Sequence, residues 1–413
     1  MTDAPTPPQQ PADAIPSVAA RLAVWQRAGG IVTPIITAFL AFLIGGLVVL
    51  ATTHRNPLNT YKAIFDGSGL NWLFPWVGGA ARTSAALNLQ QTLILVIPLI
   101  LTGLSVAFAF RCGLFNIGGQ GQYIVGIMVG VQMGVWFKST PSALHIFLAV
   151  TAATLAGAIW GGIAGFLRAT VGAHEVITTI MLNWIAIWVV SYLIGFGGPL
   201  QDKAQVAVPV SREIAPNAHL PVFWGNPLLQ GLDIGFFIAL GALVVYWIVI
   251  NRTTLGFEVR GVGYNAEAAR TGGIGVARNY FLAMAIAGGF SGLAAAMDIL
   301  GWQFRLDITT VQISSQIAFT GIAVALLGRN TALGTFFAAV LFGALLNGTS
   351  TRNLDPTIFP PELAGNLTRI IQGLVVLFVG ADLLVLYLWQ IRRKIRIRRV
   401  QTPAQVAPTS TAE

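Results

Sequence analysis

The 413-residue chain has little charge. Charged residues make up 9% of it and hydrophobic residues 55%, and the mean hydropathy is +0.73. A typical soluble globular domain carries roughly a quarter charged residues. The composition therefore excludes a water-soluble enzyme and indicates an integral membrane protein.

Cysteine, histidine and lysine are also scarce. Cys112 is the only cysteine, so no disulfide forms within the chain. None of the lysines follows a glycine, so the Gly-rich phosphate loop of ATPases is absent and ATP is not bound by that route. The histidines lack the paired spacing of metal ligands, which predicts no metal centre. They are His54, His145, His174 and His219. With no nucleophile elbow and no paired carboxylates, the chain is not expected to be an enzyme.

Long apolar runs, by contrast, are abundant. Ten of them approach the roughly 20 residues that a helix needs to cross the ~30 Å hydrocarbon core of a bilayer. Backbone groups in lipid must be paired internally, and unbroken rather than alternating runs exclude a β-barrel. The sequence therefore predicts an all-α integral membrane protein with about ten transmembrane helices. An alternative for the two adjoining runs after Ile313 is that they form one long bent helix. The predicted spans are 31–51, 91–110, 115–136, 143–167, 176–197, 232–250, 281–300, 313–327, 332–348 and 368–390.

The basic residues are distributed unevenly between the two sides of such a bundle. With the N-terminus inside and ten crossings, fifteen of the 24 lysines and arginines fall on the inner side and nine on the outer side. This asymmetry predicts that both termini are cytoplasmic. The net charge of +9 thus follows from membrane orientation and does not indicate nucleic-acid binding. The stretch IRRKIRIRRV at 391–400 is predicted to flank the membrane and contact anionic lipid.

The domain organisation follows from these segments. A single transmembrane domain is predicted over 31–390, between a disordered cytoplasmic tail at 1–30, rich in Pro, Gln and Ala, and a basic cytoplasmic tail at 391–413. The loop 52–90, with several tryptophans, is expected to lie along the outer membrane interface. The loop 198–231 contains five prolines, which predicts an irregular outer cap.

The cytoplasmic loop 251–280 contains the pattern of a short helix. Asn265 is a plausible N-cap, Glu267 falls in the first turn, and Gly272 with Gly273 ends the run. A helix of about two turns is marginal in water, so it is expected to need a docking surface. An ordinary capped loop between two spans is an equally open interpretation.

Uncharged polar residues lie within or beside the predicted spans. Buried amides cost several kcal/mol each when unpaired, so they should face other helices or water. Two interpretations remain open: hydrogen bonds that fix the helices, or the lining of a route for a polar solute. The residues are Asn116, Gln120, Gln122, Asn183, Gln303, Gln316 and Asn347. Asp298 and Asp382, the carboxylates within the spans, lack mid-depth partners of opposite sign. An ion-coupled transporter or a channel is therefore the weaker alternative.

Four separated segments together resemble the permease subunits of bacterial ABC importers, in the branch that handles nucleosides and simple sugars. The resemblance runs in order from about residue 90 to 390. The segments are GLFNIGGQGQ at 113–122, HEVITTIMLNWIA at 174–186, GFEVRGVGYNAEAARTGGI at 256–274 and GIAVALLGRNTALGTFFAAVLFGALLNG at 321–348. The resemblance implies a plasma-membrane permease that translocates a small polar solute by alternating access. It also places GLFNIGGQGQ beside the central route, where helix fixing is the favoured role of its amides.

The resemblance also implies roles and partners. The Glu-Ala-Ala pattern with its following glycine would dock on an ABC ATPase, and ATP with Mg²⁺ would be bound there, leaving this chain without a cofactor. The implied ATPase-coupling residues are Arg260, Gly263, Asn265, Glu267, Ala268, Ala269, Gly272 and Gly273. Further implied partners are a second permease, often a different chain, and a lipid-anchored solute-binding protein. The exact solute is not implied.

Overall fold

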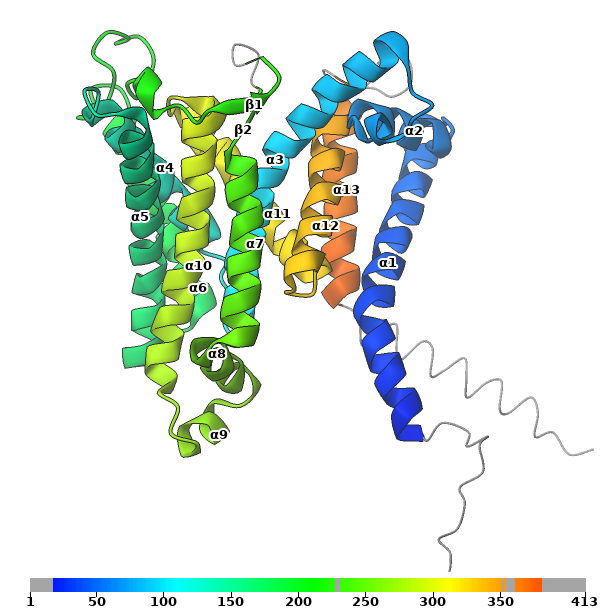
Figure 1. Ribbon diagram of the computed structural model, residues 1–413, viewed down its shortest axis with the longest axis vertical. Helices are drawn as coiled ribbons and strands as arrows, with labels where there is room; N and C mark the ends of the chain where they lie inside the picture. The colour runs from blue at the N-terminus through cyan, green and yellow to red at the C-terminus, as the bar shows by residue number, and fades with distance from the viewer. Residues whose placement is uncertain (1–17, 227–230, 351–352, 354–360, 381–413) are drawn as a thin grey trace, which may run out of the picture.

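The computed structural model describes the chain except residues 1–17, 227–230, 351–352, 354–360 and 381–413. The described part is mostly helical (Figure 1). Its α-helices are α1 Val18–Thr53, α2 Pro57–Gly67, α3 Gly79–Arg111, α4 Gly119–Trp136, α5 Ser142–Val171, α6 Glu175–Ile194, α7 Gly235–Arg252, α8 Thr254–Tyr264, α9 Ala266–Thr271, α10 Val276–Asp298, α11 Ile308–Leu327, α12 Ala332–Gly348 and α13 Pro361–Gly380. The short elements are the 3₁₀ helices η1 Leu70–Leu73 and η2 Pro216–Ala218, the π-helix η4 Ile299–Gln303, and the antiparallel strands β1 Val222–Trp224 and β2 Leu232–Asp233.

The all-α prediction is confirmed, and every predicted apolar segment overlaps a helix. Five described helices are long and apolar enough to cross a membrane, namely α3, α5, α6, α7 and α10 with η4. A sixth is added if α1 and α2, bent by 112° at their junction, are counted as one span. The segment after Ile313 forms two helices, α11 and α12. They are separated by a turn in which Arg329 and Asn330 have positive φ, so the alternative of one bent helix is wrong.

Two predictions about segment boundaries need correction. The predicted disorder of 1–30 is wrong for 18–30, which is the first part of α1, because the prolines of the tail end at Pro16 and good helix formers follow. The loop 52–90 is largely helical, since it contains α2 and η1, and α3 begins at Gly79. The tail 391–413 and Asp382 lie outside the described residues. Among its described residues, the segment 198–231 is irregular apart from η2 and β1, as predicted.

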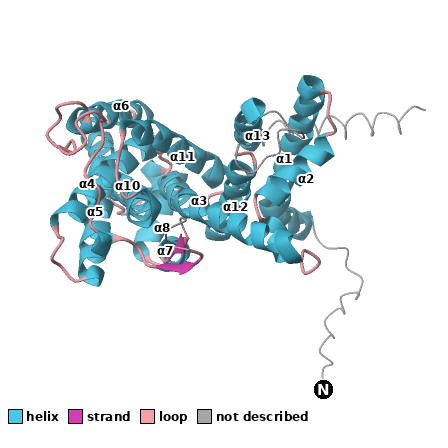
Figure 2. Ribbon diagram, turned by 90° about the horizontal axis from the view of Figure 1, so that it is seen from above, coloured by secondary structure: helices cyan, strands magenta, loops and turns pink. Residues whose placement is uncertain are grey.

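The helices form two groups joined by α3 and α11 (Figures 1 and 2). One group contains α4, α5, α6, α7 and α10, and the other contains α1, α2, α12 and α13. At 33 residues α3 is about 50 Å long, and it packs against α10, α11, α12 and α7. The start of α1 points to the same end of the bundle as α8 and α9, while β1 and β2 lie at the opposite end.

Glycines bring α5 and α10 into backbone contact. Gly157 and Gly161 of α5 are four residues apart and share one face, which meets Gly288 and Gly292 of α10. A Cβ at Gly157 would lie 2.7 Å from the Cα of Gly292, and one at Gly161 would lie 3.0 Å from the Cα of Gly288. Lipid tails are as apolar as leucine, so helices associate in membranes through such close packing rather than through the hydrophobic effect. This contact is the centre of the larger helix group.

Candidate functional site

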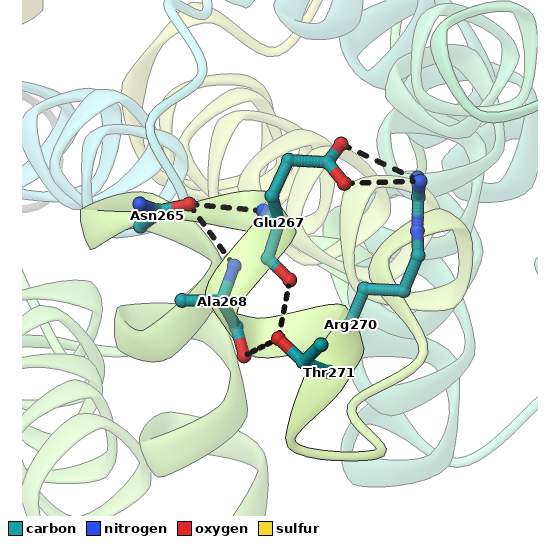
Figure 3. Close-up of polar contacts among 5 residues, drawn as sticks. All are labelled: Asn265, Glu267, Ala268, Arg270 and Thr271. Carbon is teal, nitrogen blue, oxygen red and sulfur yellow. Dashed lines mark hydrogen bonds and ion pairs between the residues drawn. The ribbon is translucent and has the colours of Figure 1, made fainter.

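The predicted short helix exists as α9 and is closed at its start by Asn265 (Figure 3). The Asn265 Oδ1 atom accepts hydrogen bonds from the backbone N–H groups of Glu267 and Ala268, both at 3.0 Å. These bonds satisfy two of the donors that a helix leaves unpaired in its first turn. Arg270 and Glu267 form an exposed ion pair at 3.4 Å. The N-cap prediction is therefore confirmed.

The end of α9 is fixed as firmly as its start. Gly273 has φ of +81° and donates its N–H to the carbonyl of Arg270, while Ile274 donates to the carbonyl of Ala269. This bond pair is the Schellman motif, whose left-handed position favours glycine. Gly272 is the C-cap, as the sequence predicts. Both ends of a six-residue helix are thus capped within its own loop.

The two faces of α9 differ in exposure. Ala269 is buried, whereas Ala268 is exposed and the side chain of Glu267 is 79% exposed. α9 projects from the end of the bundle below α8 (Figure 1). A short, doubly capped helix with a small alanine and a carboxylate on its outer face is a rigid projection that a partner protein can grip.

The helix α8, which precedes α9, was not predicted. Its glycines lower its intrinsic helix propensity, but Thr253 caps it through the N–H of Gly256 at 3.1 Å and it packs against α3, α7 and α10. Of the residues assigned to docking, Arg260 donates Nε to the carbonyl of Gly256 at 3.2 Å. Gly263 lies against the backbone of Arg111 at the end of α3. Arg260 and Gly263 both lie in α8, whereas the other residues assigned to docking lie in α9 or at its two ends.

The amides of GLFNIGGQGQ bond mainly to one another. Asn116 and Gln122 exchange two hydrogen bonds of 2.9 Å, and the Asn116 Nδ2 atom also donates to Ser105 Oγ at 3.0 Å. Ser291 of α10 donates to the same Ser105 Oγ at 2.9 Å. All four side chains are buried. This network joins α3, α4 and α10. No pattern in the sequence indicates that the two serines belong to it.

The side chain of Asn183, in α6, caps the start of α4. Its Oδ1 accepts from the N–H of Gly121 at 2.8 Å and its Nδ2 donates to the carbonyl of Ile117 at 3.0 Å. The N-cap of α4, Gly118, has no side chain for this purpose. Asn183 thus fixes α6 to the start of α4.

Gln120 differs from these amides. It is 6% exposed, and within the part of the chain that the structure describes its side chain has no hydrogen-bond partner. It lies in the first turn of α4, and α4 packs against α6 and α11. A buried amide with no hydrogen-bond partner among the described side chains favours a water or solute partner.

The remaining three predicted amides lie elsewhere. Asn347 of α12 donates Nδ2 to the carbonyl of Asn88 at 2.8 Å and to Thr92 Oγ1 at 3.0 Å, which ties α12 to α3. The Oε1 atom of Gln303, in η4, is buried without a partner among the described residues. Gln316 lies in α11, and its side chain is outside the described ones. The seven amides therefore do not form one site.

Acidic and thiol groups offer little chemistry. Asp298 is buried, and its carboxylate accepts from the Tyr123 hydroxyl and from Trp302 Nε1. Burial raises the pKa of the Cys112 thiol to about 12, so Cys112 is not a reactive thiolate. Among the described residues, no group of three or more His, Cys, Asp or Glu is placed to hold a metal ion.

Comparison with known proteins identifies the family. The family model described as branched-chain amino acid transport system, permease component, matches residues 88–380. The chain is 34% identical to the guanosine ABC transporter permease protein NupP of Bacillus subtilis, over 86% of this chain and 95% of NupP. It is 33% identical to the glucose ABC transporter permease protein TsgB13 of Haloferax volcanii, over 84% of this chain and 86% of TsgB13. A further relative, the guanosine ABC transporter permease protein NupQ of Bacillus subtilis, is 28% identical over 61% of this chain and 78% of NupQ.

No solved structure was found to be similar to the chain. The family match nevertheless covers more than half of the chain, and the similarity to NupP extends over nearly the whole of that relative. The apolar helices agree with a multi-pass membrane protein. The chain therefore belongs to the family of transport-system permease components and is a membrane-spanning ABC permease.

Proposed function

We propose that this chain is the permease of an ATP-driven importer that moves a nucleoside or a simple sugar across the plasma membrane by alternating access. The observation that supports this most directly is α9, a helix capped at both ends with Glu267 and Ala268 exposed. The relatives named for guanosine and glucose support the two solute classes. A separate ATPase binds ATP and Mg²⁺ and docks on α9. This chain catalyses no reaction.

The proposed orientation places α8 and α9 in the cytoplasm. The chain then crosses the membrane about ten times with both termini inside, which the excess of basic residues on that side supports. The start of α1 lies at the α8–α9 end of the bundle, which agrees with this orientation (Figure 1). The irregular segment 198–231 then faces outward, where a lipid-anchored solute-binding protein delivers the solute.

A second permease completes the proposed transporter. Bacillus subtilis has two guanosine ABC permeases, NupP and NupQ, both similar to this chain. Two different permeases in one transporter are therefore proposed here as well. Broad apolar faces, such as that of α6 with Trp184, Trp188 and Tyr192 exposed, would meet lipid or this second permease.

Transport of labelled nucleosides and sugars in membrane vesicles tests the proposed function. Vesicles that contain this permease, its second permease, the ATPase and the binding protein should accumulate one solute class only when ATP is supplied. Uptake driven by a proton or sodium gradient in the absence of the ATPase would instead identify a secondary transporter. Passive flux without nucleotide would identify a channel. Vesicles without this permease are the control.

Gln120 is proposed to contact the solute, whereas Gln122 holds the helices. Gln120→Leu removes no hydrogen bond to any described residue, so we expect unchanged thermal stability and a KM for uptake raised about three- to tenfold. Gln122→Leu, the same change two residues along α4, removes both hydrogen bonds that the buried Asn116 amide exchanges with Gln122, so Asn116 keeps only its bond to Ser105. We expect it to lower the free energy of unfolding by about 1–3 kcal/mol. Equal effects of the two variants on KM and on stability would contradict the assignment.

A further inference from the structure

The end of α8 is in backbone contact with the end of α3. A Cβ added at Gly263 would overlap the carbonyl oxygen of Arg111 and lie 3.0 Å from the carbonyl carbon of Cys112. On the other side of the contact Gly113, with φ of +74°, would place a Cβ 3.3 Å from the Cα of Gly263. No side chain lies between the two backbones at this point. A displacement of α8 is therefore transmitted to the end of α3 without a flexible side chain that absorbs it.

Arg111 continues this contact to the turn between α11 and α12. Its Nε and Nη2 atoms donate to the carbonyl oxygen of Asn330 at 3.1 and 2.7 Å. Tyr246 of α7 donates its hydroxyl to the same oxygen at 2.7 Å. Arg329 and Asn330 both have left-handed φ, of 50° and 54°, so the turn holds an uncommon backbone conformation. The two N–H groups of one planar guanidinium hold the Asn330 carbonyl in a defined direction, so the end of α3 and the turn are linked with a fixed geometry.

A second tie joins α8 to α10. Glu258 of α8 accepts a hydrogen bond from the Nδ2 atom of Asn279 at 2.9 Å, and Asn279 is fully buried. Cys112 donates its thiol to the carbonyl of Asn279 at 3.7 Å. α8 is thus bonded to α10 through Glu258 and lies in backbone contact with the end of α3, which Cys112 in turn bonds to α10. The link through Arg111 differs because it reaches the turn between α11 and α12.

We propose that Arg111 is the positioning residue that passes movement of the ATPase-docked α8–α9 unit to the α11–α12 turn. This inference rests on the proposed function, in which α9 is the ATPase-docking helix. α11 leads into this turn and packs against α4 and α6. Gln120 lies in the first turn of α4, so movement of α11 reaches the proposed solute contact. Arg111 therefore determines how much solute is moved per ATP and does not determine whether the ATPase binds.

Arg111→Met tests the inference, because methionine retains much of the side-chain length and loses both donors. In reconstituted vesicles we expect normal co-purification of the ATPase and normal ATP hydrolysis, with uptake per ATP lowered about tenfold or more. Arg111→Lys, with a single ammonium and no planar fork, should fall between the wild type and methionine. Unchanged uptake per ATP in Arg111→Met would overturn the inference.

Gly263→Ala changes the contact between α8 and the backbone of Arg111. This variant still tests the inference if Arg111→Met fails to fold. The added methyl pushes α8 away from Arg111, so uptake per ATP should again fall. The matched control is Gly261→Ala in the same helix, whose Cβ would meet the movable Cδ1 of Ile274 at 3.3 Å. The control should transport as the wild type does.

Combining Gly263→Ala with Arg111→Met should give little further loss, since both changes break one link. Additive losses, or equal losses in both glycine variants, would overturn the inference. Failure of the proposed function is distinguishable, because the wild-type permease would then show no ATPase binding or no ATP-driven uptake at all.

Discussion

Replacing Glu267 and Ala268 together by tryptophan is expected to abolish ATPase binding, and with it ATP-driven uptake. Both residues are on the exposed face of α9, while Ala269 faces the protein, so the change alters the docking surface and leaves the buried side of the helix intact. Residues at the centre of an interface contribute about 2–4 kcal/mol, so affinity should fall by about 30-fold or more. The measurement is the amount of ATPase retained by the tagged permease in a pull-down from detergent-solubilised membranes.

A control variant separates docking from general damage. Lys203→Trp introduces one of the same large side chains at an exposed position in the segment 198–231, at the opposite end of the bundle. It should retain the ATPase in full. If the α9 variant also retains it, the ATPase does not dock on α9 and the proposed coupling is wrong.

Removing the N-cap tests whether rigidity of α9 matters in addition to its surface. Asn265→Ala leaves the outer face unchanged but loses the two hydrogen bonds to Glu267 and Ala268, which costs helix formation about 1 kcal/mol. The affinity for the ATPase should therefore fall only about fivefold. A loss as large as that of the tryptophan variant would mean that Asn265 itself is part of the contact.

The features that the sequence predicted well are those set by nearby residues. Asn265 caps α9 because its side chain reaches N–H groups two and three residues on, and Gly273 ends it because the left-handed position favours glycine. Long apolar runs become helices because unpaired backbone groups are costly in lipid. Each of these causes acts within a few residues or within one run, so it is visible in the sequence.

The features that escaped prediction depend on residues far apart in the chain. Gln120 and Gln122 are two residues apart and chemically identical, and they face different sides of α4. Of the two, only Gln122 has a hydrogen-bond partner among the described residues, Asn116. Ser105 and Ser291 complete that network across 186 residues. The helix α8 exists despite its glycines because it packs on α3, α7 and α10. No local pattern indicates these contacts.

Gly288→Ala is expected to destabilise the bundle more than any other single methyl addition considered above. The new Cβ would overlap the carbonyl oxygen of Gly157 and lie 3.1 Å from the Cα of Gly161, so it meets backbone that has no rotamer to change. α5 and α10 would have to separate, and the close packing that holds helices together in lipid would be lost along their contact. Overpacking costs 1–3 kcal/mol even where side chains adjust, so a loss of about 3 kcal/mol or more is expected here.

The neighbouring glycine provides the matched control for this experiment. A Cβ at Gly289 would lie 3.7 Å from the Cβ of Ala158 and 3.8 Å from Cγ2 of Thr154, which are ordinary contacts. Gly289→Ala should therefore leave stability unchanged or raise it by up to about 1 kcal/mol, because alanine favours the helix over glycine. Thermal unfolding of both purified variants in one detergent gives the comparison. Equal stability of the two would mean that α5 and α10 are not in backbone contact at Gly288, and the α5–α10 contact would no longer be the centre of the larger helix group.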